Sequence, residues 1–259
     1  MIHKPISSAE VPRKEEPMPL NAPRNRSTAR TCMAALLATA CIAASATDLA
    51  AARPHTTLDD LTAQVNSRRL HLPPGHWVLV GQHEVETSGK KNRAGFGIEA
   101  WLAQTDGGAL RALMRLSLPL EDYPRVHAAT GNRCPEEDGI QRADLSPNPD
   151  LPECLGIYGH RDLLEAVASR SPGVVAWMTQ AGIANPGAVV RFTYRQRTDN
   201  SYGGISLFLP TAHFDSDEAA TAWARQLRAA CRPLFESSSG DATLPPPPAA
   251  PAADPPAAR

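Results

Sequence analysis

The stretch GFGIEAWLAQTDGGALRALMRLSL, residues 95–118, decides the fold because it contains two runs in which apolar residues alternate with others. In both runs the apolar residues occupy even-numbered positions, namely Phe96, Ile98, Ala100, Leu102, Leu110, Ala112, Met114 and Leu116. A period of two places them all on one face of a β-strand. The stretch therefore predicts a β-hairpin with one apolar face and one face that carries Trp101, Arg111 and Arg115.

The sequence TDGG between the two runs has to keep both apolar sets on the same face. Opposed residues of an antiparallel pair share a face, so the numbers of paired residues must add up to an even number. A two-residue turn violates this condition, whereas a three-residue loop at residues 105–107 places Leu102 opposite Leu110. We therefore predict the three-residue loop, which also places Trp101 opposite Arg111 as a cation–π pair.

The rest of the middle of the chain is predicted to consist of further strands and helices. Residues 76–87 are rich in strand formers, and residues 189–198 and 203–210 predict a second hairpin. Apolar residues at helical spacing predict helices at residues 56–69, 160–169, 171–182 and 215–235. We expect an α+β fold, in which an antiparallel sheet built from hairpins carries helices packed on one side, as a single domain over residues 57–236.

Residues 1–46 have the organisation of a secretory signal peptide. A short Ala-rich apolar run is followed by an Ala-Ser-Ala site that ends at Ala46, and it is preceded by three basic residues, Arg24, Arg26 and Arg30. The run is too short to span a bilayer as a helix, and translation from Met18 would give a leader of ordinary length. We therefore predict a periplasmic or secreted protein with no transmembrane span in the mature chain.

Further predictions concern lipidation, the two ends of the exported chain and its charge. The sequence LLATAC is a loose match to a lipobox, and lipidation of Cys41 would instead anchor the protein to the envelope. Residues 47–56 are predicted to be a linker, and residues 237–259, rich in Pro and Ala, a disordered tail. From Thr47 onward the chain has 20 Lys and Arg against 24 Asp and Glu, so no basic excess favours nucleic acid as a partner.

One segment resembles a known group of proteins. The segment NRCPEEDGIQRADLSPNPDLPECLGIYGHRDLLEAV, followed by two strands and a terminal helix that contains Ala-Trp-Ala, is similar to a group of exported bacterial proteins with no assigned activity. In that group a Cys in a Pro- and Asp-rich loop precedes a Pro-Glu-Cys segment. The resemblance covers residues 76–235 and implies an envelope location and a disulfide between Cys134 and Cys154. It implies no reaction.

The position of Cys231 also favours a disulfide between the other two cysteines. Residues 119–159 form a long irregular stretch, which in a compact domain is either functional or held by a crosslink. Cys231 falls on the apolar stripe of the last predicted helix, where a free thiol packs as a small hydrophobe. We therefore predict a disulfide between Cys134 and Cys154 and a buried, reduced Cys231. The competing arrangement joins Cys231 to one of the other two cysteines.

No motif specifies a reaction. The sequence GFGIEA matches the glycine pattern of dinucleotide-binding proteins only formally, because it lies within a strand and not between a strand and a helix. The histidines fit no standard zinc spacing, and we predict no cofactor. The acidic residues between Cys134 and Cys154 offer oxygen ligands for Ca²⁺, although a solvated acidic loop is the simpler interpretation.

A candidate binding face follows from the alternation in the two hairpins. If both join one sheet, the residues opposite the apolar sets share an exposed surface, which consists of Trp101, Arg111, Arg115, Arg191 and Arg195. Such a surface could bind an anionic ligand or an envelope protein. The alternative is a solvated face with interleaved glutamates, namely Glu84, Glu86 and Glu99. We predict a non-enzymatic interaction or accessory module, and the alternative function is a small periplasmic hydrolase.

Overall fold

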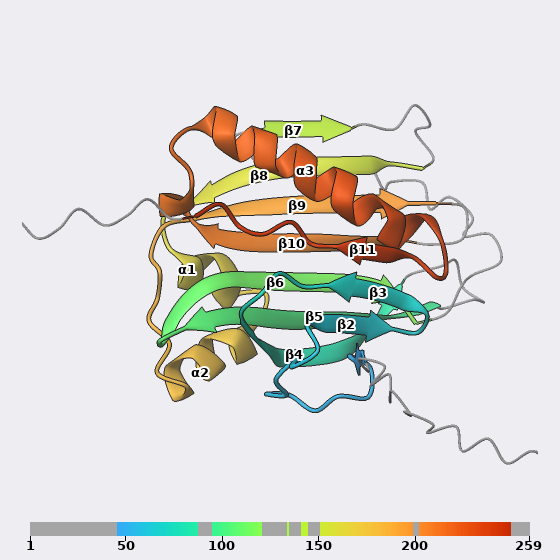
Figure 1. The fold of residues 1–259 in the computed structure, drawn as a ribbon, viewed down its shortest axis with the longest axis horizontal. Helices are drawn as coiled ribbons and strands as arrows, with labels where there is room; N and C mark the ends of the chain where they lie inside the picture. The colour runs from blue at the N-terminus through green and yellow to red at the C-terminus, as the bar shows by residue number, and fades with distance from the viewer. Residues whose placement is uncertain are drawn as a thin grey trace, which may run out of the picture. The chain divides into compact units, whose positions relative to one another are not determined.

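A seven-stranded antiparallel sheet forms the centre of the fold (Figure 1). The computed structural model describes residues 46–87, 95–120, 134, 141–144, 151–198 and 202–249. In order across the sheet, the strands are β4 (His76–Thr87), β5 (Gly95–Asp106), β6 (Ala109–Pro119), β10 (Tyr202–Pro210), β9 (Val189–Arg197), β8 (Glu153–His160) and β7 (Gln141–Asp144). Strands β4 to β6 and strands β7 to β10 are each consecutive in the chain, so the sheet is two meanders joined where β6 pairs with β10.

The body of the hairpin of β5 and β6 has the predicted faces, but its turn differs, and Leu110 lies on the face of Trp101 and not on the predicted one. Leu102 pairs with Met114 and Trp101 with Arg115, so paired numbers add up to an even number in the body of the hairpin, as predicted. The turn consists of Gly107 and Gly108, both with positive φ (55° and 81°), which other residues rarely adopt. A register shift after Gln104 restores the parity that this two-residue turn would break. The predicted three-residue loop is therefore wrong.

A second, four-stranded sheet has the order β1-β2-β3-β11. Its strands are β1 (Thr47–Asp48), β2 (Thr62–Val65), β3 (Arg68–His71) and β11 (Asp241–Thr243). The helix predicted for residues 56–69 is wrong, because these residues form the hairpin of β2 and β3 instead. The chain turns at Leu61 and Asn66, which have positive φ values of 52° and 54° and are incompatible with a continuous helix. Of the spaced apolar residues, Leu58 and Val65 are fully buried and Leu61 is partly buried, all packed in the cluster of the sheet core.

The three helices are divided between the two faces of the seven-stranded sheet. Helix α3 (Asp217–Glu236) and the four-stranded sheet contribute to one apolar cluster with most of the even-numbered residues of β5 and β6. Helices α1 (Leu163–Ala168) and α2 (Pro172–Gln180) pack with the opposite set, which includes Trp101 and Phe208. The α+β class with an antiparallel sheet is confirmed, and its helices lie on both faces.

Both ends of the described chain belong to the fold. Leu49 and Leu244 are fully buried, and the indole N–H of Trp223 donates to the Pro246 carbonyl oxygen at 3.1 Å. Residues 47–56 are therefore not a linker, and the predicted disordered tail is wrong for residues 237–249. The signal peptide prediction, including Met18 and Cys41, and residues 250–259 lie outside the described residues. Within those residues no helix is both long and apolar enough to cross a membrane.

Candidate anion-binding site

The face of the seven-stranded sheet that carries α1 and α2, here called the outer face, contains four of the five residues of the predicted binding face, namely Trp101, Arg115, Arg191 and Arg195. Arg111 is the extra residue at the register shift in β6 and does not share this face with them. Trp101 is not exposed on it, because it is 3% accessible and belongs to the core beneath these helices. Its ring lies 6.2 Å from that of Phe208. The sequence could not show that helices cover this part of the face, so the predicted exposure of Trp101 and its pairing with Arg111 are both wrong.

Two of the four predicted arginines also have other roles. Arg191 is 5% accessible, and its guanidinium carbon lies 4.3 Å from the ring centroid of Tyr158, which is a cation–π contact. Arg111 is exposed at the end of the hairpin, where its Nη2 lies 2.8 Å from Oδ2 of Asp106. Neither residue contributes to a hollow with the other arginines.

Arg115 and Arg195, in contrast, line one polar hollow of about 450 Å³ on the outer face. We call this hollow the arginine pocket, and its lining residues are His83, Glu99, Arg115, Arg170 and Arg195. Four of them come from β4, β5, β6 and β9, and Arg170 follows α1 in the chain. The strands hold their side chains on one face by alternation, so the sheet itself positions the pocket.

Strand β10 leaves room between the arginines because it carries small residues on the outer face. Gly204 pairs with Ser117 on one side and Arg195 on the other, and Ser206 lies likewise next to Arg115. A Cβ atom at Gly204 would lie 2.8 Å from Cγ of Arg195, closer than such atoms normally approach. Glycine at this position therefore lets the Arg195 side chain lie across β10.

The arginine pocket has more positive than negative charge. Its one carboxylate, Glu99, accepts a hydrogen bond of 2.5 Å from Arg115 and lies 4.0 Å from Nε2 of His83. Among the described residues, the Arg195 side chain has no ion pair or hydrogen-bond partner. Of the residues that the structure describes, three guanidinium groups and one carboxylate line the pocket. Arg115 pairs with Glu99 and Arg170 has an interaction of its own, so an anionic ligand can offset the charge of Arg195 above all.

The predicted disulfide lies beside this pocket. Cys134 and Cys154 are bonded, and Cys154 is the cross-strand partner of Arg195, so both residues lie on the outer face. Cys231 is free and fully buried, which confirms the predicted pairing. Burial raises the pKa of the Cys231 thiol to about 12, so it remains a thiol at neutral pH. Of the six acidic residues between Cys134 and Cys154, four lie outside the described residues, and Glu153 is buried in an ion pair with Arg228. Among the described residues no group of three His, Cys, Asp or Glu side chains could hold a metal ion.

Sequence reasoning missed two residues of the arginine pocket. His83 is opposite Glu99, but a register shift between Leu79 and Gly81 changes the faces along β4, and simple alternation does not predict that shift. Arg170 lies between two short helices, and no pattern in the sequence shows that this connection reaches the outer face.

Known proteins offer no template for this arrangement. Comparisons with protein-family models, with curated proteins and with solved structures found no match for the chain. The function of the arginine pocket is therefore inferred from its charges and its geometry.

Proposed function

We propose that the protein is an exported, non-enzymatic module that binds an anionic ligand bearing carboxylate or phosphate groups. The observation that carries this proposal is the convergence of Arg115, Arg170 and Arg195 around one carboxylate. A guanidinium group matches carboxylate and phosphate oxygens with two parallel N–H donors, and it stays charged at any physiological pH. The position on a rigid sheet favours recognition because little side-chain order has to be created on binding.

The individual residues have different roles in this proposal. Arg195, without a described partner, makes the first direct contact with the ligand. Arg115 shares its charge between the ligand and Glu99, which holds the guanidinium in place through the 2.5 Å hydrogen bond. The carboxylate of Glu99 also repels an anionic ligand. We therefore expect ligands with more than one negative charge to bind more tightly than ligands with one.

Replacing Arg195 by Gln is expected to weaken the binding of inorganic phosphate or succinate by about tenfold. A hydrogen bond to a charged group contributes about 1.5–3 kcal/mol, and 1.4 kcal/mol corresponds to a tenfold change. Isothermal titration calorimetry at low ionic strength measures this, because salt screens an exposed site. Arg111→Gln is the matched control, since Arg111 is an exposed arginine of the same strand as Arg115 but does not line the arginine pocket.

Glu99→Gln tests the same site with the opposite sign. Removal of the one carboxylate among the described lining residues should strengthen phosphate binding, while the amide keeps a hydrogen-bond acceptor for Arg115. Equal affinities for Arg195→Gln and Arg111→Gln, or a loss of binding in Glu99→Gln, would contradict the proposal.

The proposed location rests on the signal-peptide pattern and is supported by the disulfide, because disulfides persist in oxidising compartments. We propose export without lipidation, to the periplasm or out of the cell, and the alternative is an anchor through Cys41. A fusion of residues 18–60 to a reporter that fluoresces only after folding in the periplasm is expected to give a signal. A cytoplasmic fusion with an intact N-terminus would contradict export, and labelled palmitate at Cys41 would identify a lipoprotein.

A hydrolase is the less favoured function. His83 and Glu99 could act as a base and its orienting carboxylate, but their closest atoms are 4.0 Å apart, beyond hydrogen-bond length. Among the described residues that line the arginine pocket there is no Ser, Thr or Cys to act as a nucleophile. The geometry therefore supports binding better than catalysis.

A further inference from the structure

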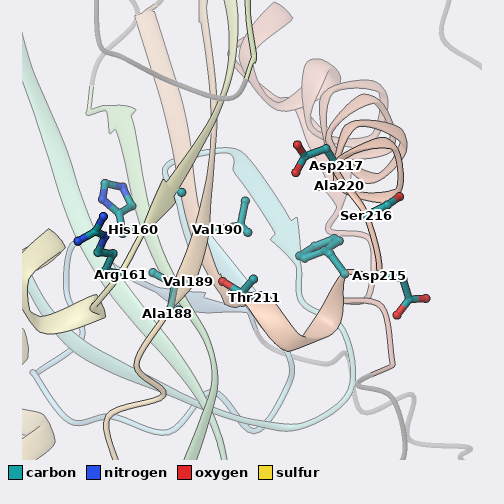
Figure 2. Close-up of a pocket in the computed structure, with 12 residues that line it drawn as sticks. His160, Arg161, Ala188, Val189, Val190, Thr211, Asp215, Ser216, Asp217 and Ala220 are labelled. Atoms are coloured by element: carbon teal, nitrogen blue, oxygen red, sulfur yellow. The ribbon is translucent and has the colours of Figure 1, made fainter.

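A second hollow, here called the end pocket, lies where β8 ends and β9 begins (Figure 2). Its volume is about 440 Å³. Three segments line it: residues 159–161 at the end of β8, residues 188–190 at the start of β9, and residues 211–220 from the 3₁₀ turn η1 (Thr211–His213) into α3. It shares no lining residue with the arginine pocket.

The floor of the end pocket is apolar. Val189, Val190 and Ala220 are almost completely buried, and the ring of Phe214 is half-buried between the floor and the rim. Phe214 is held by contacts with Phe192 and Trp223, whose ring centroids lie 5.2 and 6.2 Å from its own. A fixed aromatic ring next to aliphatic side chains provides a surface on which an apolar group can pack.

The rim of the end pocket has an arginine on one side and two carboxylates on the other, of which that of Asp215 points away from the pocket (Figure 2). Arg161 follows β8 on one side, and Asp217 stands at the start of α3 on the other (Figure 2). Both are exposed, and within the described part of the chain neither side chain has an ion pair or hydrogen bond, with the other or with any third residue. Each of these charges is thus available to a ligand.

We propose that the end pocket binds a short peptide with free termini and an apolar side chain. The peptide carboxylate would pair with Arg161, its ammonium group with Asp217, and its side chain would pack on Phe214 and Val190. In a single amino acid both charges are on one carbon, whereas each further residue separates them by about 3.3–3.6 Å. Charges that stand on opposite sides of an apolar floor therefore suit a dipeptide better than an amino acid.

The test compares four forms of one dipeptide, Leu-Leu: free, N-acetylated, C-amidated, and capped at both ends. Calorimetry or NMR titration of the full chain is expected to show about two- to fivefold weaker binding for each capped end, the range that an exposed ion pair provides. Arg161→Gln should abolish only the preference for a free carboxylate. Asp217→Asn should abolish only the preference for a free ammonium group.

Matched controls separate this effect from general changes in charge. Glu218→Gln alters the same first turn of α3 without altering the lining of the end pocket, and Arg225→Gln removes an exposed arginine elsewhere on the helix. Both controls should keep both preferences. The proposal is overturned if Leu-Leu does not bind at millimolar concentration, if the doubly capped peptide binds as tightly as the free one, or if the controls change the preferences as much as Arg161→Gln and Asp217→Asn do.

Discussion

Replacing Cys134 and Cys154 together by Ser is expected to lower the free energy of unfolding by about 3 kcal/mol. The bond links residues 20 positions apart, and closing a loop of about this length restricts the unfolded chain by about that amount. Urea denaturation of the wild type and the double variant measures the difference between their free energies of unfolding. Because the unfolded chain expands when the crosslink is removed, the slope against urea concentration should rise, and the comparison therefore uses the free energies extrapolated to zero urea.

Cys231 provides the control for this experiment. Because Cys231 is free and buried in the core, Cys231→Ala should leave the sensitivity to reducing agent unchanged, although it removes some packing of its own. Reducing agent should therefore destabilise Cys231→Ala as much as the wild type, and it should have no effect on the double Ser variant. Recovery of Cys231 in the main disulfide peptide after non-reducing digestion would refute the assignment.

Replacing Arg228 by Met is expected to destabilise the protein by about 2–3 kcal/mol. Nε and Nη2 of Arg228 donate to the two carboxylate oxygens of Glu153 at 2.7 and 3.0 Å, and the hydroxyl of Tyr194 donates to Glu153 at 3.0 Å. Loss of one partner leaves a buried carboxylate uncompensated, which costs about 3–5 kcal/mol in a fully buried pair. Since the Arg228 side chain is 30% accessible, the expected loss is smaller.

The double variant Glu153→Gln with Arg228→Met distinguishes this cause from lost packing. If the penalty comes from the unpaired carboxylate, neutralising Glu153 should restore part of the stability that Arg228→Met alone removes. Chemical denaturation of the wild type, both single variants and the double variant completes the cycle. Losses that simply add would contradict the pairing.

The same pair makes stability depend on acidic pH. Burial raises the pKa of Glu153, but hydrogen bonds from Arg228 and Tyr194 outweigh this effect and hold it below the ordinary value of 4.5. A carboxyl whose pKa is lower in the folded chain stabilises the fold above its unfolded pKa, and this contribution is lost as the pH falls through the folded pKa. The stability difference between the wild type and Glu153→Gln should therefore shrink below about pH 4.5. A difference that stayed constant down to pH 3 would be incompatible with this contribution.

Local alternation in the sequence predicted much of the central sheet. The residues of β5, β6, β9 and β10 alternate strictly enough to identify both hairpins and their faces. The turn at Gly107 and Gly108 was missed because the parity rule alone cannot detect a bulge that compensates for a two-residue turn. The helix predicted for residues 56–69 was wrong for a different reason. The spacing of Leu58, Leu61 and Val65 is compatible with a helical stripe and with a bent hairpin, and packing against the rest of the protein selects the hairpin.

The candidate site was predicted only in part, because the exposure of a residue on a sheet face depends on which other segments cover that face. Alternation correctly placed Arg115 and Arg195 on the face opposite the main core. It could not show that α1 and α2 return over Trp101, or that Arg191 packs on Tyr158. These outcomes depend on where distant segments come to lie, and single-sequence patterns contain no information about that.

The pairing of β3 with β11 has a consequence for the order of folding. Residues 69–71 lie beside residues 241–243, so the hairpin of β2 and β3 keeps an open edge until residues 241–243 have been synthesised. Contacts between segments so far apart in the chain form late and slowly. A nascent chain of this protein should therefore remain incompletely folded for as long as its C-terminal residues are missing, which is the state in which a polypeptide can still be threaded through a narrow channel.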